Sequence, residues 1–308
     1  MKACILHGPN AEKSVIERAF KALKAHGAEA WEGDRDGPMN AITSRLKDTG
    51  LVLTLGGDGT FLAGARVAAP RGIPLLGVNL GRLGFLTEID AQELEKGLER
   101  FFKGDYRIEE RNVLQSTLKR DGKNIAQAIG LNEAVINRAG EARMLRVEID
   151  VGGQPVGVID ADGVMVATAT GSTAYALSAG GPPVDPRVRA LVVVPLAAHA
   201  VITRPVVLPE AVSIDLTVLW GRGFAGADGH VEAPLSPGSR LEIRPGPELQ
   251  VVQIGAMPFV RRLREKVRFG MPLKEAHDAP DGHRVHERQA VDADGPAATD
   301  VGAASEGG

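Results

Sequence analysis

The pattern of apolar residues changes near residue 107, and this change constrains the fold more than any other feature of the sequence. Before it, short apolar runs at 3–6, 51–55 and 73–78 alternate with segments of helical spacing. Such alternation predicts a parallel sheet with helices on its faces. After it, short alternating runs follow one another closely, which is typical of a β sandwich or barrel. We therefore expect an α/β N-terminal domain with a parallel sheet, followed by an all-β sandwich-like C-terminal domain.

Composition divides the chain further. We assign residues 1–108 to the α/β domain and residues 109–255 to the β-rich domain. In residues 256–270, aliphatic side chains fall on one helical face among basic residues, which predicts a C-terminal helix that packs on the body. Residues 271–308 consist largely of Gly, Ala, Pro, Asp and Glu, a composition that predicts a disordered tail.

Charge and residue usage exclude several classes of function. A net charge of −3 and aromatic residues at 4% give no support for binding of nucleic acid. Cys4 is the single cysteine, so no intramolecular disulfide forms. No apolar stretch is long enough to span a membrane or to form a signal-peptide core, and we expect a cytoplasmic protein without a membrane partner. The histidines of the tail are weak evidence for a metal site; they are His277, His283 and His286.

A glycine-rich loop directly follows the apolar run 51–55. Glycines let the backbone approach a phosphate, and the dipole of a following helix favours negative charge there. No Gly-Lys-Ser/Thr follows, so the loop is not a Walker loop, and its acid suggests a base or a metal contact for a reacting hydroxyl. A tight structural turn is the alternative interpretation. The loop residues are Gly56, Gly57, Asp58, Gly59 and Thr60.

Two further polar clusters follow predicted strands. Residues 168–175 supply four hydroxyls and one aromatic ring, and Asn132 with Glu133 could bind an adenine edge or a ribose diol. Taken singly, a solvated Ser/Thr loop and a turn with a solvated acid are the alternatives. Turn chemistry is also the simpler interpretation of 162–163 and of 228–230, the second of which predicts a hairpin.

Taken together and in this order, these elements resemble the NAD kinase family, enzymes that phosphorylate NAD to NADP. The resemblance covers about residues 50–255. The glycine loop alone is shared with diacylglycerol and sphingosine kinases, whereas the Gly-Ser-Thr-Ala-Tyr string is far more discriminating. The segments that carry the resemblance are 56–60, 77–86, Asn132-Glu133, Asp162-Gly163, Thr170 to Tyr175 and Gly180-Gly181-Pro182.

The resemblance implies ATP as phosphoryl donor, a divalent cation such as Mg²⁺, and NAD bound between the two domains and at a subunit contact of a homo-oligomer, a dimer or tetramer. It implies that Asp58 accepts the proton of the adenosine ribose 2′-hydroxyl, while Gly56, Gly57, Gly59 and Thr60 approach the phosphates. Asp162 would serve the nicotinamide end in a neighbouring subunit, and no metal ligand is assigned. The implied NAD contacts are Asp58, Gly59, Asn132, Glu133, Arg143, Asp162, Thr173, Ala174, Tyr175, Ser178 and His230.

The chain departs from the family pattern at three places. Asp160-Ala161 stands where the family has Arg-Gly, the segment 167–170 replaces Ser-Thr-Pro-Thr, and Ala198-His199 replaces Pro-His. The first departure puts an acid in place of a basic contact. It leaves open a catalytically silent NAD(P)-binding regulator, and the glycine loop that other kinases share leaves open a lipid kinase.

Overall fold

The computed structural model describes residues 1–35, 39–81, 84–87, 89–140, 143–199, 204–255 and 257–267. The chain divides into two units, Met1–Arg262 and Leu263–Gly308, which are treated separately. The first unit contains all the sheets. Among the described residues, no helix has both the length and the apolar character that crossing a membrane requires.

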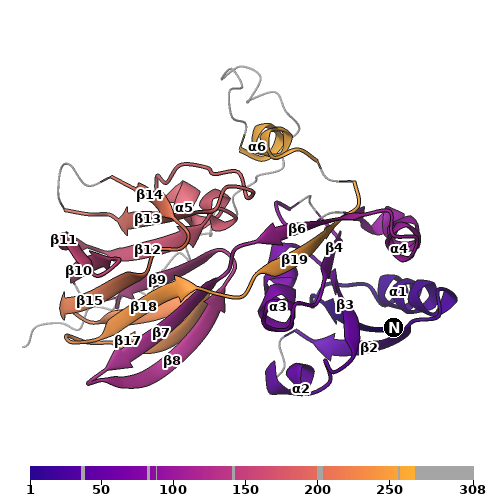
Figure 1. Cartoon of the computed structure of the whole chain (residues 1–308), viewed down its shortest axis with the longest axis horizontal. Coiled ribbons are helices and arrows are strands. Elements are labelled where there is room, and N and C mark those ends of the chain that lie inside the picture. Colours follow the sequence, from indigo (N-terminus) through magenta and orange to yellow (C-terminus); the bar gives the residue numbers. More distant parts are fainter. Residues whose placement is uncertain are drawn as a thin grey trace, which may run out of the picture. The chain divides into compact units, whose positions relative to one another are not determined.

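The N-terminal part of the first unit is built on a seven-stranded sheet with the order β2-β1-β3-β4-β19-β6, to which β5 is added beside β4 (Figure 1). All neighbouring strands run parallel except β6, which is antiparallel to β19. The expected parallel sheet is therefore confirmed. Its strands are β1 (Lys2–His7), β2 (Glu29–Asp34), β3 (Thr49–Leu55), β4 (Leu75–Asn79), β5 (Ile89–Asp90), β6 (Arg107–Arg111) and β19 (Leu249–Gln253).

Helices connect these strands and cover the sheet. Val15, Ala19 and Leu23 form the buried stripe of the first helix, at the three- and four-residue spacing that one helical face requires. The interior strands are apolar on both faces, as expected for a sheet with helices on both sides. The helical segments are α1 (Lys13–Ala25), α2 (Met39–Thr43), α3 (Asp58–Ala68), η1 (Ala69–Arg71), η2 (Ala91–Glu93) and α4 (Leu94–Phe102).

The second part contains two six-stranded antiparallel sheets. The first has the order β11-β10-β15-β18-β7-β8, and its strands are β7 (Leu114–Arg120), β8 (Lys123–Gly130), β10 (Leu145–Val151), β11 (Gln154–Ala161), β15 (Ile214–Trp220) and β18 (Arg240–Pro245). The second has the order β14-β13-β12-β9-β16-β17, and its strands are β9 (Glu133–Arg138), β12 (Gly163–Thr168), β13 (Ala190–Leu196), β14 (Val206–Pro209), β16 (Gly223–Ala227) and β17 (His230–Leu235). The short helical segments η3 (Gly171–Thr173) and α5 (Tyr175–Ser178) follow β12.

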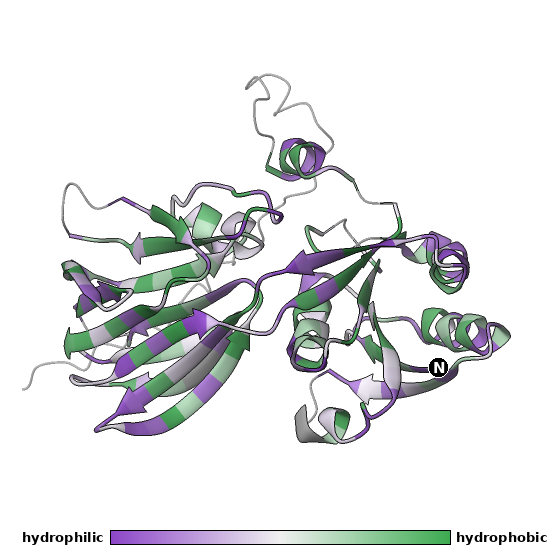
Figure 2. Ribbon diagram, viewed as in Figure 1, coloured by the Kyte–Doolittle hydropathy of each residue, from purple (hydrophilic) through white to green (hydrophobic). Residues whose placement is uncertain are grey.

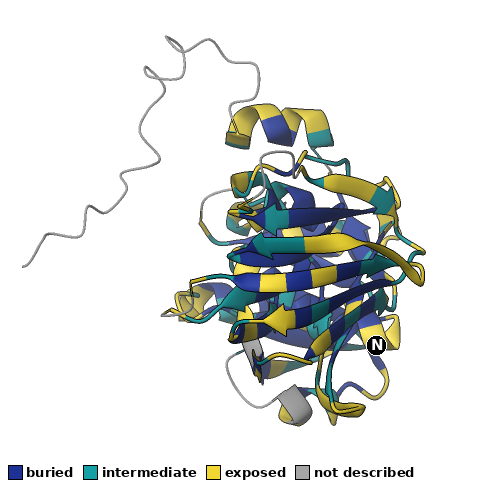
Figure 3. Ribbon diagram, turned by 90° about the vertical axis from the view of Figure 1, so that its left-hand side faces the viewer, coloured by how far each residue is buried: buried dark blue, intermediate teal, exposed yellow. Residues whose placement is uncertain are grey.

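A shared apolar core joins these two sheets face to face. Val147 and Leu216 come from one sheet, Val164 and Val193 from the other, and all four lie in one buried cluster. Along the strands, hydrophobic and hydrophilic residues alternate (Figure 2), and buried positions alternate with exposed ones (Figure 3). This period of two is what a sheet with one buried face requires, so the sandwich-like domain is confirmed.

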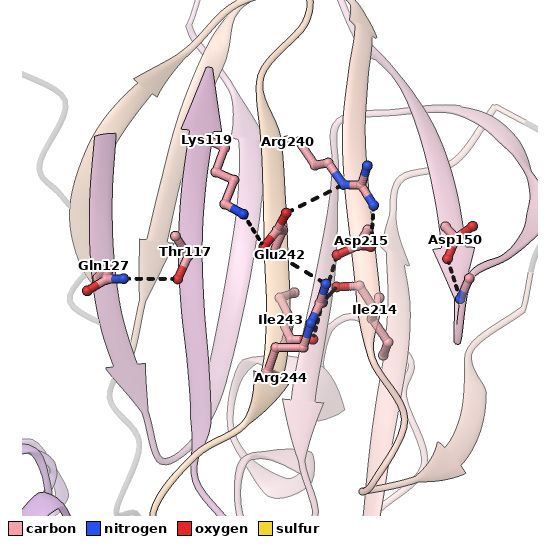
Figure 4. Close-up of polar contacts among 11 residues, drawn as sticks. Thr117, Lys119, Gln127, Asp150, Ile214, Asp215, Arg240, Glu242, Ile243 and Arg244 are labelled. Atoms are coloured by element: carbon pink, nitrogen blue, oxygen red, sulfur yellow. Dashed lines mark hydrogen bonds and ion pairs between the residues drawn. The ribbon is translucent and has the colours of Figure 1, made fainter. Parts of the chain in front are cut away.

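The outer face of the β7, β15 and β18 strands is covered by ion pairs (Figure 4). Asp215 accepts hydrogen bonds from Arg240 at 2.5 Å and from Arg244 at 2.7 Å, and Lys119 lies 2.9 Å from Glu242. Burial alone would raise the pKa of Asp215, but the two guanidinium groups hold it below its usual value. This face is therefore strongly polar.

The last strand of the first unit returns to the first sheet. β19 pairs with β4 on one side and with β6 on the other, although it lies within the range 109–255 that we assigned to the second domain. The proposed boundaries themselves stay a prediction. A helix, α6 (Phe259–Val267), forms within 256–270, and the tail at 271–308 lies outside the described residues.

Candidate functional site

The glycine loop connects the carboxyl end of β3 to the first turn of α3. Gly57 is the N-cap residue in an extended conformation, and Asp58 is the first helical residue. A side chain at Gly56 would collide with the side chain of Thr60, which is 2% exposed. The buried side chain of Thr60 therefore packs against Gly56 within the loop. Gly57 and Gly59 are exposed, so their backbone atoms face solvent.

The carboxylate of Asp58 is held by two backbone amides. It accepts hydrogen bonds from the amide nitrogens of Phe85 at 2.9 Å and Leu86 at 3.1 Å. A Cβ atom at Gly84 would overlap the Asp58 carboxylate, so this approach requires glycine there. The end of the segment 77–86 therefore positions the predicted base, because it supplies Gly84 and both hydrogen-bond donors.

Two arginines that the sequence analysis did not single out lie beside this arrangement. Arg262 donates from Nη1 to the carbonyl of Phe85, the same residue that donates to Asp58. Arg35, just after β2, donates from Nη1 to Thr60 Oγ1 at 3.3 Å, and this nitrogen lies 3.9 Å from the Cβ position of Gly59. The glycine loop lacks a lysine, and Arg35 supplies a cation instead. No local sequence signal connects it to the loop.

Asp228 organises the turn that carries the amide–acid pair. Its carboxylate accepts hydrogen bonds from the amides of Leu131 at 2.9 Å, Asn132 at 2.8 Å and Glu133 at 3.2 Å. The hairpin expected at 228–230 forms between β16 and β17, but its acid also acts at long range. Asp228 therefore fixes the backbone of Asn132 and Glu133, a contact that the turn interpretation alone did not reveal.

Glu133 is buried beside this carboxylate. Its side chain is 6% exposed, and its Oε2 atom has no hydrogen-bond partner. Burial, with a smaller contribution from the negative charge of Asp228, raises the pKa of Glu133 to about 7. A buried acid with an unused oxygen at a turn is arranged to receive a ligand hydroxyl or amine.

Three hydroxyls of the hydroxyl-rich segment 168–175 donate to backbone carbonyls; that of Thr173 donates to Thr170 at 3.2 Å. Thr168 donates to the carbonyl of Leu131 at 2.6 Å and accepts from the amide of Gly171, while Ser172 donates to the carbonyl of Ala169. Gly171 packs so closely on the backbone of Asn132 that a side chain would not fit. The hydroxyl-rich segment and the amide–acid pair are therefore in direct contact.

A cleft of about 820 Å³ lies next to these elements. Thr170 and Thr173 line it, as do Phe85 and Leu86, whose amides bind Asp58. The acid, the hydroxyl-rich segment and, through Gly171, the amide–acid pair are thus brought together from segments far apart in the chain. Five arginines also line this space, here called the arginine cleft; they are Arg100, Arg107, Arg111, Arg187 and Arg262.

The remaining residues predicted to contact NAD lie in the β-rich part of the first unit. Thr173 and Ala174 are half-buried, and Tyr175 and Ser178 are exposed on α5. His230 is exposed and begins β17, two residues after Asp228. Arg143 is exposed in the segment before β10.

Asp162 lies at the opposite end of β12 from the hydroxyl-rich segment. Thr168, the first residue of that segment, comes six positions after Asp162, which is roughly 20 Å along a strand at 3.3 Å per residue. Asp162 accepts a hydrogen bond from Arg138 Nε at 2.8 Å and does not line the arginine cleft. Within one chain, it is not brought together with Asp58.

Asp160, which stands where the family has arginine, forms an ion pair with Arg146. Asp160 accepts two hydrogen bonds from Arg146, at 2.7 and 2.8 Å, which lower its pKa. Arg146 is opposite Asp160 in the β10–β11 ladder. The charge of Asp160 is therefore neutralised locally by a neighbouring strand.

Comparisons with known proteins give one consistent result. Residues 13–106 match the family model of the ATP-NAD kinase N-terminal domain, and residues 131–253 match that of the ATP-NAD kinase C-terminal domain. The chain is 44% identical over 236 residues to the NAD kinase of Heliobacterium modesticaldum, covering 76% of this chain and 83% of that protein. It is 41% identical over 226 residues to the NAD kinase of Nocardia farcinica, covering 72% and 69% of the two chains.

Solved structures agree in fold. The crystal structure of yeast NADH kinase complexed with NADH superposes with a TM-score of 0.79 at 24% identity and covers 88% of this chain and 89% of that one. An NAD kinase from Archaeoglobus fulgidus in complex with ATP gives a TM-score of 0.70 at 26% identity, with coverage of 87% and 99%.

Proposed function

The chain belongs to the ATP-NAD kinase family, and we propose that its Asp58 accepts the proton of the NAD adenosine ribose 2′-hydroxyl while ATP donates the phosphoryl group. The observation that carries this proposal is the carboxylate of Asp58, which is fixed by the amides of Phe85 and Leu86, two residues that line a cleft. The 2′-oxygen forms a bond to the γ-phosphorus, the bond from that phosphorus to the β,γ-bridging oxygen breaks, and ADP leaves. The products are NADP and ADP, and the proton goes to Asp58.

The acceptor would bind across the two polar elements that Gly171 holds together. Asn132 and the buried Glu133 would supply an amide and an acid for the adenosine. The other proposed contacts come from the segment that Gly171 holds against Asn132 and from the start of β17; they are Thr173, Ala174, Tyr175, Ser178 and His230. These elements are rigid because Asp228 and Thr168 hydrogen-bond their backbones. Positioning of this kind supplies most of the acceleration in phosphoryl transfer.

The donor phosphates would approach the glycine loop, with Arg35 near Gly59. Among the described residues, no three His, Cys, Asp or Glu side chains are grouped as a metal cage. This arrangement fits Mg²⁺ that is bound mainly by nucleotide phosphates and water, as is usual for this ion, with Asp58 as the candidate protein carboxylate. The cation would neutralise charge on the transferring phosphoryl group.

Asp162 supports a shared site between subunits. It lies at the far end of β12 from the hydroxyl-rich segment and does not line the arginine cleft. We propose a homo-oligomer in which Asp162 serves a neighbour's nicotinamide end. Light scattering with size-exclusion chromatography tests this, and a fully active monomer would contradict it.

Asp58→Asn tests the role of the base. A positioned general base contributes about 10²–10⁴-fold, and we expect kcat to fall by that order. Binding of NAD, measured by calorimetry, should persist. Asp121→Asn, in the exposed turn between β7 and β8, is the matched control and should keep full activity. Turnover of Asp58→Asn close to that of the unchanged protein would remove Asp58 from this role.

One assay separates the remaining alternatives. Purified chain is incubated with NAD, ATP and Mg²⁺, and NADP is measured. Binding of NAD without formation of NADP would favour a silent regulator, whereas phosphorylation of a lipid alcohol would favour a lipid kinase. The pairing of Asp160 with Arg146 weakens the case for the regulator, because the acid at that position carries no unpaired charge toward a ligand.

A further inference from the structure

The last residue of β1 lies at the point where the order of strands in the first sheet reverses. The chain passes from β1 to β2 on one side and then to β3 on the other. In open α/β sheets, ligands bind at such a point, at the carboxyl ends of the strands. His7 ends β1 there, and its partners across the sheet are Asp34 of β2 and Leu55 of β3, directly before the glycine loop. A side chain that the catalytic proposal does not use therefore lies beside the proposed donor site.

The turn that follows His7 packs against the glycine loop. The Gly8 amide donates to the carbonyl of Leu55 at 2.9 Å, and the Gly8 carbonyl accepts from the amide of Ala11 at 3.1 Å, which closes the turn 8–11. A Cβ atom at Gly8 would lie 2.9 Å from Thr60 Oγ1, which is too close for a real side chain. The position of the Gly8 backbone therefore affects Thr60 and, through it, the loop that the donor phosphates would approach.

Both ring nitrogens of His7 face acceptor oxygens. Nδ1 lies 3.1 Å from the carbonyl oxygen of Gly8, and Nε2 lies 2.8 Å from Oε1 of Glu32. A neutral imidazole has one N–H and can donate only one of these hydrogen bonds, whereas the protonated ring donates both. The protonated ring therefore joins the turn 8–11 to the neighbouring strand β2.

The charges around His7 favour the protonated ring. Partial burial alone would lower its pKa, but hydrogen bonds to Glu32 and Gly8, with the negative charges of Glu32 and Asp34, raise it above the ordinary 6.5. Both acids belong to β2, and the β3 side contributes the uncharged Leu55. The side chain of Glu32 is 54% exposed, so water weakens the ion pair. We therefore expect an effect of several-fold, not of several orders of magnitude.

We propose that His7 is a positioning residue for the phosphoryl donor: its protonated ring holds the Gly8 carbonyl and the Glu32 carboxylate, and so keeps the turn 8–11 packed against Thr60 of the glycine loop. The inference rests on the proposed function, which brings the donor phosphates to that loop, and it adds a residue from outside the loop. Loss of the ring proton removes one of the two hydrogen bonds and leaves Glu32 without its counter-charge. Donor binding is therefore strongest below the pKa of folded His7 and weakens as the pH rises through it.

The experiment compares the unchanged chain with His7→Gln, which keeps one donor and one acceptor but carries no charge. Binding of a non-hydrolysable ATP analogue with Mg²⁺ is measured by calorimetry between pH 5.5 and pH 9. Terminal phosphates also lose a proton at about pH 6, so the ratio of the two Kd values is compared at each pH. We expect His7→Gln to bind about three- to tenfold more weakly at pH 6 and about equally at pH 9. The KM for ATP should follow this ratio, while that for NAD should change by less than about twofold.

Glu32→Gln tests the charge with the ring in place. It removes the acid that favours protonation, so the pH at which donor affinity falls should move to lower values, and an NMR titration of the His7 ring should show the same shift. The matched control is His26→Gln. His26 is exposed at the end of α1 and stacks on Phe102, and its replacement should leave donor binding unchanged at every pH.

A Kd ratio for His7→Gln that stays at one, or that does not change with pH, would overturn the proposal. An equal loss of NAD affinity would also overturn it, because the turn would then not act on the donor. If thermal unfolding shows that His7→Gln does not fold, Glu32→Gln decides, and an unshifted midpoint rejects the proposal. Failure of the proposed function gives a different result, because a chain that makes no NADP can still bind the analogue in step with the His7 proton. Absence of analogue binding at every pH would reject the inference itself.

Discussion

Glu133→Gln should stabilise the free protein increasingly as the pH rises. Burial raises the pKa of Glu133 in the folded chain to about 7, from an ordinary value of 4.5. An acid whose pKa is raised by folding holds its proton in the folded state while the unfolded state releases it. Folding stability is therefore lost as the pH rises from the unfolded value to the folded value, and the loss is complete above it.

The magnitude follows from the two pKa values. A difference of about 2.5 at 1.36 kcal/mol for each pKa unit gives a loss of about 3 kcal/mol at pH 8. At pH 5 the same relation gives about 1 kcal/mol, because the unfolded carboxyl is then only partly ionised. Glutamine stays neutral throughout, so the variant avoids this loss.

Urea denaturation of both proteins between pH 5 and pH 8, without NAD, measures the difference in free energy of unfolding. The variant should gain from about 1 to about 3 kcal/mol over the original chain across this range. Glu148→Gln removes an exposed carboxylate on β10 and serves as the control, with an expected effect within about 0.5 kcal/mol. A gap for Glu133→Gln that does not widen with pH would refute the reasoning.

Three other changes have defined outcomes. Gly84→Ala should displace the Asp58 carboxylate and lower kcat by about 10²-fold or more with little effect on the melting temperature, so an active variant would show that the amide contacts are dispensable. Asp228→Ala leaves the three amides of 131–133 without their acceptor and should destabilise the chain by about 3 kcal/mol in urea denaturation; an unchanged midpoint would argue against this role. Cys4 is buried and its pKa is raised to about 12, so Ellman's reagent should react with it only after unfolding, and rapid reaction of the native protein would contradict the burial.

The elements that the sequence predicted well are those whose signal is local. The run before the glycine loop forms β3, and the helix expected after the loop begins within it, at Asp58, because Gly57 is already the N-cap. By contrast, β2 was not predicted. Only Gly33 is buried in this edge strand, so no apolar run marks it.

The site residues that the sequence did not reveal act over long distances. Asp228 has the local pattern of a hairpin turn, and nothing in that pattern shows that its carboxylate binds the amides of 131–133. Arg35 and Arg262 are ordinary surface residues in sequence, yet both lie beside the glycine loop or its partner segment. Such contacts depend on the order of strands in the sheets, which residue types alone do not determine.

The position of β19 between β4 and β6 has a consequence for how this molecule can be divided. The strand β19 is synthesised only after all the strands of the sandwich. A fragment that ends at residue 108 would therefore leave the β4 edge at Leu75 without its partner, with β5 covering only Val78 and Asn79. The N-terminal sheet is therefore incomplete without a strand that follows the sandwich in the sequence. An unfolding event in one should propagate to the other, and designers who wish to shuffle the halves would have to carry residues 249–253 along with the first.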